Sequence, residues 1–377
     1  MILRRYTRLM MALAGLVVAY PGGAARAGSD ALQAVCFAPD ALRALDGEKV
    51  ITRGNHDFDV PPKSGAAVIP ATPIEVARRG AIRRVDLPKG EKLIALTFDL
   101  CEQRGEIAGY DGAVFDYLRR EGIKATLFAG GKWMRSHRAR TEQLLTDPLF
   151  EIANHGENHR NLRLLDSPSI QSEIAGPQLA YDSARRRLAT TQCAARAPDG
   201  LDAVPQRIAL FRFPFGACNA SSMTAVNDAG LLAIQWDVSA GDPDPHQTPQ
   251  MIANAIVRSV KPGSIVVAHG NGRGWNTAAA LPLVIPKLKA MGYSFVTVSE
   301  LLARGKPVIA GSCYDTRPGD TDRYDFLLAG AKAKPPLGAT PIETGSLPWL
   351  TDSKAAPEAK AKTPAAEGVA PSLSWPF

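Results

Sequence analysis

The sequence predicts an α/β domain in which parallel strands are flanked by helices, and three observations support this. Between residues 91 and 303, short apolar runs rich in β-branched residues alternate with amphipathic stretches. Helix start and stop signals separate them, such as Asp166 before Ser167 and Pro168. Alternation of strand and helix requires crossover connections, which produce parallel strands with helices outside, as a barrel or an open sheet.

Seven strands and five helices are expected in this region. The expected strands are 93–98, 125–129, 150–154, 210–213, 233–236, 264–268 and 294–298. The expected helices are 113–120, 168–188, 223–229, 249–260 and 281–291. Gly122, Gly230 and Gly292 lie just past three helix ends, where a glycine favours termination.

The N-terminus has the pattern of a secretory signal peptide over residues 1–27. Three arginines precede an apolar run at 10–20, and Ala25-Arg26-Ala27 resembles a cleavage site. The run is shorter than the ~20 residues that span a bilayer, so we expect export to the periplasm or the exterior without a stable membrane span. Removing the four arginines of this segment lowers the formal charge from +7 to +3. The basic balance is therefore poor evidence for nucleic-acid binding.

Three further segments flank the expected domain. Residues 28–90 are interrupted by prolines and are interpreted as an irregular N-terminal extension, and residues 304–331 as a C-terminal extension. Residues 332–377 are rich in Pro, Ala and Lys and are expected to be disordered. Five cysteines follow the signal peptide, so at least one has no partner within the chain. Neither their pairing nor the oligomeric state follows from the sequence.

Polar residues occur where the expected strands end, which is the edge where parallel α/β folds collect their chemistry. Asp99 follows the first strand, and His155 and His159 follow the third. Two imidazoles four residues apart can reach one metal ion, zinc among others. The alternative is that the acid caps a turn and the histidines are ordinary loop residues.

Later strand ends add Arg212, the acids Asp237 and Asp242, and His269. An arginine there can orient a carboxylate through its planar fork. A histidine at the edge of the core is the simpler interpretation of His269 taken alone. Because five of the seven expected strand ends carry such groups, coincidence is a poor explanation.

The order of these segments resembles the NodB-homology polysaccharide deacetylases over roughly 210 residues. The family motifs T-F-D-D, H-[ST]-x-x-H and R-x-P-[YF]-G correspond to residues 97–100, 155–159 and 212–216. The segment 239–243 matches D-x-x-D-W loosely, and 266–269 matches the closing histidine motif. The resemblance implies a distorted (β/α)7 barrel that hydrolyses N-acetyl, less often O-acetyl, groups of a polysaccharide.

The resemblance also implies a role for each matching residue. The roles are Asp99 as general base, Arg212 orienting it, His155 and His159 as ligands of a divalent metal, usually zinc, the Phe215 N–H as oxyanion donor, His269 as general acid, and Asp242 tuning it. This division is reasonable, because amide hydrolysis needs an activated water, stabilisation of charge and a proton for the leaving amine.

The sequence departs from the family at Leu100, where the third metal ligand is expected. The metal could then use Glu102 or Asp111 from the following loop, or no further protein ligand. Cys101 could be a nucleophile or a ligand, although a structural cysteine is the simpler interpretation. A second departure is Pro243, where the family has tryptophan.

Three functions follow from these observations. The first is an exported deacetylase acting on a cell-envelope or extracellular glycan that contains N-acetylated sugars. The second is a metal-poor family member that binds glycan without efficient turnover, as Leu100 would explain. The third, a hydrolase of a small C–N substrate, is disfavoured by the signal peptide. A match of 54–57 to the G-N-H-[DE] element of metallophosphoesterases stands alone and carries no function. The sequence does not identify the polymer.

Overall fold

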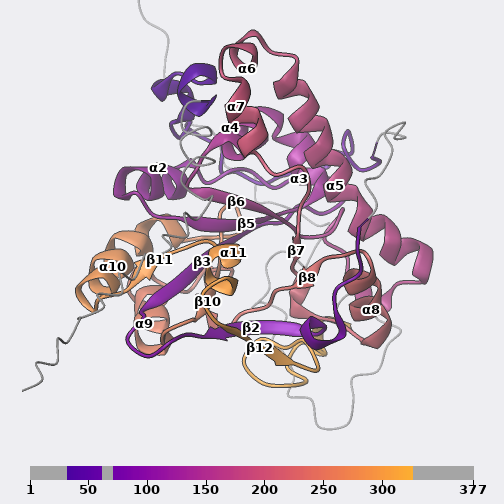
Figure 1. Cartoon of the computed structure of the whole chain (residues 1–377), viewed down its shortest axis with the longest axis vertical. Coiled ribbons are helices and arrows are strands. Elements are labelled where there is room, and N and C mark those ends of the chain that lie inside the picture. Colours follow the sequence, from indigo (N-terminus) through magenta and orange to yellow (C-terminus); the bar gives the residue numbers. More distant parts are fainter. Residues whose placement is uncertain (1–31, 62–70, 326–377) are drawn as a thin grey trace, which may run out of the picture. The chain divides into compact units, whose positions relative to one another are not determined.

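The computed structural model describes residues 32–61 and 71–325, all of which belong to one compact unit spanning 1–336. A second unit, 337–377, lies outside the described residues, as do the expected signal peptide and the expected tail from 332 onward. The main sheet of the described part has eight parallel strands (Figure 1). Its order is β8-β7-β6-β5-β3-β10-β9, with β11 also paired to β3.

The strand bounds agree with the predicted pattern, with shorter strands late in the chain. They are β3 Leu93–Leu100, β5 Ala125–Ala129, β6 Phe150–Asn154, β7 Leu210–Phe211, β8 Leu232–Ala233, β9 Val238–Ser239, β10 Ile265–His269 and β11 Ser294–Phe295. The last predicted strand is cut short because Thr297 begins a helix, with a capping box to Glu300. The prediction did not include β9, which is only two residues long.

Helices cover the sheet and connect its strands. They are α2 Gly112–Glu121, α3 Gly131–Ser136, α4 Arg138–Thr146, α5 Ser167–Ala189, α6 Gln192–Arg196, α7 Pro198–Ala203, α8 Ala220–Asp228, α9 Pro249–Ser259, α10 Thr277–Ala290 and α11 Val298–Leu302. The predicted end signals are confirmed at α5, where Asp166 caps Ser169, and at α2, where Gly122 is left-handed. No helix among the described residues is long and apolar enough to cross a membrane.

A small antiparallel pair lies along the seam of the incomplete barrel. It consists of β2, Ala81–Asp86, and β12, Lys306–Ala310, one from each extension. Single bridges join β2 to Ile234 on one side and to Ser264 on the other. Residues 81–86 are therefore regular, although they lie in the N-terminal extension. The alternating apolar pattern of β2 is interrupted by two arginines, which hid this strand from the sequence analysis.

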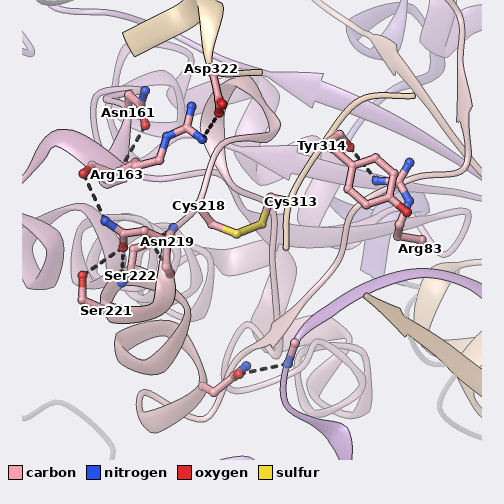
Figure 2. The surroundings of a disulfide bond; sticks show 12 residues. Arg83, Asn161, Arg163, Cys218, Asn219, Ser221, Ser222, Cys313, Tyr314 and Asp322 are labelled. Atoms are coloured by element: carbon pink, nitrogen blue, oxygen red, sulfur yellow. Dashed lines mark hydrogen bonds and ion pairs between the residues drawn. A yellow bond between two sulfur atoms is a disulfide. The ribbon is translucent and has the colours of Figure 1, made fainter. Parts of the chain in front are cut away.

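Two disulfides attach the extensions to the barrel, and they leave one cysteine free, as the odd number predicted. Cys36 pairs with Cys193 in α6, and Cys218 pairs with Cys313 beyond β12 (Figure 2). Cys101 is the free thiol and is buried. The extensions thus form part of the folded unit, and the limits of 91–303 for the catalytic domain stay a prediction.

Candidate active site

The register of the sheet brings the ends of β3 and β10 together, with His269 directly opposite Asp99. On the other side of β3, residue Asp99 pairs with Phe128 of β5, and β5 in turn pairs with β6, which leads into His155. Asn154 at the end of β6 pairs with Phe211 of β7, directly before Arg212. The predicted site residues therefore gather at one edge of the sheet.

Arg212 holds the carboxylate of Asp99 in a buried ion pair. Its Nη1 donates to Asp99 Oδ1 at 2.8 Å and to Thr97 Oγ1 at 2.7 Å. The guanidinium lies over the Phe128 ring, 3.9 Å from its centroid, and none of Arg212 is exposed. Burial favours the neutral acid, but the charge of Arg212 and its hydrogen bond outweigh burial and lower the pKa of Asp99. Asp99 is consequently ionised at neutral pH, as a general base requires.

Asp242 and His269 form a second pair beside the first. Asp242 Oδ1 lies 3.1 Å from His269 Nδ1, and Oδ2 accepts the His269 backbone N–H at 2.7 Å. Thr277 Oγ1 donates to Oδ2 at 2.5 Å. Burial disfavours the imidazolium, yet the Asp242 carboxylate more than compensates and raises the pKa of His269. His269 therefore retains a proton more readily than an ordinary histidine, which suits a general acid.

His155 and His159 present nitrogens without hydrogen-bond partners. His155 Nδ1 lies 3.0 Å from the Arg212 carbonyl, an acceptor, so the proton is on Nδ1 and Nε2 carries the lone pair. His155 Nε2 and His159 Nδ1 are buried and unpartnered. Burial lowers the pKa of both imidazoles and keeps them neutral. Neutral imidazoles with free lone pairs fit a divalent cation.

A third protein ligand for that cation is missing. Leu100 occupies the position where the family has its third ligand, but its side chain has no donor atom and is fully buried in the hydrophobic core. Among the residues that the structure describes, no group of three or more His, Cys, Asp or Glu could hold a metal ion. Two histidines, with Asp99 Oδ2 3.5 Å from His155 Nε2, are the donor set at this edge.

The two replacement ligands considered from the sequence are held elsewhere. Glu102 Oε2 accepts the Ala108 N–H at 2.8 Å and lies 3.7 Å from His137 Nδ1. Asp111 Oδ2 is 2.8 Å from Lys49 Nζ. Neither carboxylate therefore replaces the missing acid in this arrangement. Glu102 is held by its own loop and by His137, and Asp111 by Lys49 of the N-terminal extension. That extension pairs with the loop through Thr52–Arg53 (β1) and Glu106–Ile107 (β4).

Cys101 has the properties of a structural cysteine. Burial raises the pKa of its thiol to about 12, so almost no thiolate exists at neutral pH. Its carbonyl accepts from Asn271 Nδ2 at 2.7 Å. The nucleophile and ligand alternatives both require a thiolate and are therefore disfavoured.

Phe215 lies in a strained turn at the end of β7. Its φ of 61° and ψ of 6° are left-handed, a conformation that is uncommon outside glycine and is often found at functional sites. Its ring contacts His159, with centroids 4.5 Å apart. The role of its N–H as an oxyanion donor stays a prediction. Asp237, by contrast, accepts from Ser264 and from the Ile265 N–H and serves the fold.

A buried cation behind the site escaped the sequence analysis. Lys132 is fully buried, and its Nζ donates to Asp59 Oδ1 at 2.6 Å and to the carbonyls of Gln103 and Glu106 at 2.8 Å. His56 also contacts Asp59, at 2.8 Å. The G-N-H-[DE] match at 54–57 thus has a structural role: its His56 contacts Asp59, which together with Lys132 holds the loop after β3. The partners of Lys132 are distant in sequence, so no local pattern could reveal them.

Comparison with known proteins supports the family resemblance. A family profile described as polysaccharide deacetylase matches residues 86–234. A peptidoglycan-N-acetylglucosamine deacetylase of Bacillus cereus is 31% identical over 221 residues, covering 58% of this chain and 91% of that protein. A chitooligosaccharide deacetylase of Rhizobium leguminosarum is 26% identical and covers 54% and 89%. The deacetylase PgdA of Listeria monocytogenes is 26% identical, but this chain spans only 41% of its length.

Solved structures include a CE4 family pseudoenzyme from Bacillus anthracis, 23% identical, with a TM-score of 0.47 and coverage of 60% of this chain and 70% of that one. The motifs at the strand ends, their assembly at one edge and the extent of the Bacillus cereus match agree with one another. This chain belongs to the polysaccharide deacetylase family, hydrolases that act on carbon–nitrogen bonds other than peptide bonds.

Proposed function

We propose that this protein is an exported deacetylase that removes N-acetyl groups from a cell-envelope or extracellular glycan. The observation that carries the proposal is the pairing of Asp99 with Arg212 and of His269 with Asp242 on strands in register. A domain that only bound glycan would not need an ionised carboxylate opposite an imidazole whose pKa is raised by a second carboxylate. The relatives named for peptidoglycan and chitooligosaccharides favour an N-acetylated sugar polymer as substrate.

The chemistry divides between these two pairs. Asp99, fixed by the Arg212 guanidinium, takes the proton of the attacking water, and His269 donates a proton to the leaving amine. Asp242 keeps His269 oriented and charged until that transfer. The Phe215 N–H would donate to the oxyanion of the tetrahedral intermediate. His155 and His159 would hold a divalent metal, zinc by the preference of imidazole ligands, which when bound supplies Lewis-acid activation.

Export has support from two parts of the chain. The first 27 residues have the pattern of a signal peptide. The Cys36–Cys193 and Cys218–Cys313 disulfides suit an oxidising compartment such as the periplasm or the exterior. Localisation can be tested by fractionating cells that produce the full chain and determining the N-terminus of the exported form.

One observation favours a second function, a family member that binds glycan but turns it over poorly. Leu100 removes the expected acid, and two histidines bind a metal ion less tightly than three protein ligands. Such a protein would contain little metal after purification and would still bind oligosaccharides.

The deciding experiment measures metal content and acetate release together. Purified residues 28–377 are analysed for metal and incubated with acetylated chitooligosaccharides, with and without added zinc, and with O-acetylated xylan as a second substrate. The matched control is Asp99→Asn, which keeps the size of the side chain and removes its charge. Acetate release that depends on metal and on Asp99 supports the deacetylase. Oligosaccharide binding without acetate release, even with added zinc, would support the binding function instead.

A further inference from the structure

The C-terminal extension continues past β12 into a segment that runs beside the site, residues 311–325, here named the C-terminal strap. The Cys218–Cys313 disulfide joins it to the loop that follows η4, Pro214–Gly216, the turn that holds Phe215 (Figure 2). The strap lies outside the residues that the family profile matches, 86–234.

Several polar contacts hold the strap in one position. Arg163 donates to Asp322 at 2.8 Å, to Asp325 at 2.9 Å and to the Thr321 carbonyl at 3.0 Å. Asn161 also donates to Asp325, at 2.7 Å. Figure 2 shows Asp322 directed toward Arg163 on one side of the disulfide. These contacts hold the end of the strap against the segment that contains Asn161 and Arg163.

The far end of the strap is held by Arg83 of β2. Its guanidinium donates to the carbonyls of Tyr314 and Asp315 and lies 3.7 Å from the centroid of the Tyr314 ring. Asp315 in turn accepts from Trp236 Nε1 at 2.8 Å. The Tyr314 ring therefore has a structural role, and Tyr314 serves as a control for the second tyrosine of the strap.

Tyr324, the second tyrosine, continues a row of rings that begins at the metal-binding histidines. The centroids of His155 and His159 are 4.9 Å apart, those of His159 and Phe215 are 4.5 Å apart, and those of Phe215 and Tyr324 are 5.2 Å apart. Tyr324 is partly exposed, and Arg323 lies over its ring with its Nη2 3.1 Å from the hydroxyl. The row of rings therefore ends at a partly exposed tyrosine that has a guanidinium over its ring and Phe215 tilted against it.

We propose that Tyr324 is a substrate-positioning residue whose ring binds a pyranose of the glycan next to the sugar that carries the acetyl group. The proposal rests on the proposed function, because it takes the substrate to be a sugar polymer. Pyranose rings have apolar C–H faces edged by hydroxyls, and a tyrosine offers a rigid apolar face with a polar tip. Because Asp322 and Asp325, on either side of Tyr324, are held by Arg163, little conformational entropy should be lost when a sugar binds there.

The test compares four proteins: the unmodified chain, Tyr324→Ala, Tyr324→Phe and Tyr314→Ala. Kd for N-acetylated chitotetraose is measured by calorimetry with Asp99→Asn present in every protein, so that no turnover occurs. KM and kcat for the same sugar are measured with Asp99 intact. Thermal unfolding of each variant reports whether the fold is kept. If Tyr324→Ala unfolds early, Tyr324→Leu takes its place.

Tyr324→Ala is expected to raise Kd and KM about fivefold to tenfold while kcat changes less than about twofold. Tyr324→Phe keeps the ring and should retain the original Kd. Tyr314→Ala should also retain it, because that ring lies on Arg83. An unchanged Kd for Tyr324→Ala would overturn the proposal, and so would an equal loss for Tyr314→Ala, which would indicate only a loosened strap.

The two proposals can fail separately. If no acetate is released but chitotetraose binds with a Kd that depends on Tyr324, the deacetylase proposal fails and the Tyr324 site stands. If acetate is released and neither Kd nor KM changes in Tyr324→Ala, the deacetylase proposal stands and the Tyr324 proposal fails. An unmodified chain that binds no chitotetraose overturns the Tyr324 proposal outright.

Discussion

The two halves of the site differ in how completely their residues are paired. The acid–base half consists of two pairs: Arg212 Nη1 lies 2.8 Å from Asp99 Oδ1, and His269 Nδ1 lies 3.1 Å from Asp242 Oδ1. In the metal half, His155 and His159 keep buried nitrogens without hydrogen-bond partners, and Leu100 supplies no ligand. A complete acid–base half is expected of a working hydrolase, whereas an incomplete metal half predicts weak retention of the cation.

This difference in pairing indicates which half of the site tolerates substitution more readily. A buried ion pair such as Arg212–Asp99 cannot lose one partner without leaving an uncompensated charge, which makes the arrangement all or none. A metal site can lose one ligand and still bind, because water can fill the open position. Variation in metal affinity is therefore tolerated more readily than variation in the acid–base pairs. The following experiments test this contrast.

The largest effect is expected from Asp99→Asn in the acid–base half. The amide cannot accept the proton of the attacking water, so kcat should fall about 100-fold to 10,000-fold. Measured acetate release provides the test, with bound metal determined in parallel. Activity close to that of the unmodified chain would remove Asp99 from the role of base.

The next effect concerns the metal half and the variant Leu100→Asp. A carboxylate at this position would supply the third ligand, so zinc affinity should rise about tenfold or more, given the 10- to 100-fold effects of even outer partners. Competition with a chromogenic chelator measures this Kd without relying on activity. Leu100→Asn is the matched control, because it has a similar shape and a weaker donor. Equal affinities in all three proteins would mean that the metal, if bound, uses other ligands.

A smaller change is expected for Asp242→Asn and appears in the pH profile. The Asp242 carboxylate raises the pKa of His269 by favouring the charged imidazolium, although burial opposes it. Removing the Asp242 charge lowers the pKa of His269. The imidazolium then loses its proton at a lower pH, so the alkaline limb of the kcat/KM profile moves to lower pH. The profile measured across pH 5 to 10 is the readout. An unmoved alkaline limb would assign that limb to another group.

The smallest effect is expected at Cys101, which borders both halves. Its pKa of about 12 and its burial predict that iodoacetamide at pH 8 leaves it unlabelled in the folded protein. Unfolding without reductant should expose one reactive thiol per chain, as mass spectrometry can count, since the other four cysteines are paired. Rapid labelling of the folded protein would contradict the buried, structural role.

Local patterns in the sequence predicted most strands of the sheet and the helices α2, α5, α8, α9 and α10, but not α3, α4, α6, α7 and α11. The bounds of β5 and β6 agree with the prediction residue for residue. β5 is buried along its whole length, and β6 has an apolar pattern interrupted only by Glu151 before its last residue, Asn154. The short strands β8 and β9 were harder, since two-residue pairing leaves almost no periodic signal. The β2–β12 pair joins segments more than 200 residues apart, so no local pattern predicts it.

By itself, the sequence determined the fold class, the family motifs and the candidate site residues, because each depends on short runs of neighbouring residues. Only the tertiary structure decided which cysteines pair, that Glu102 and Asp111 have other partners, and that Tyr324 lies beside Phe215. These contacts join residues far apart in the chain. Their existence depends on how distant segments pack in three dimensions, and the spacing of residues along the chain carries no record of it.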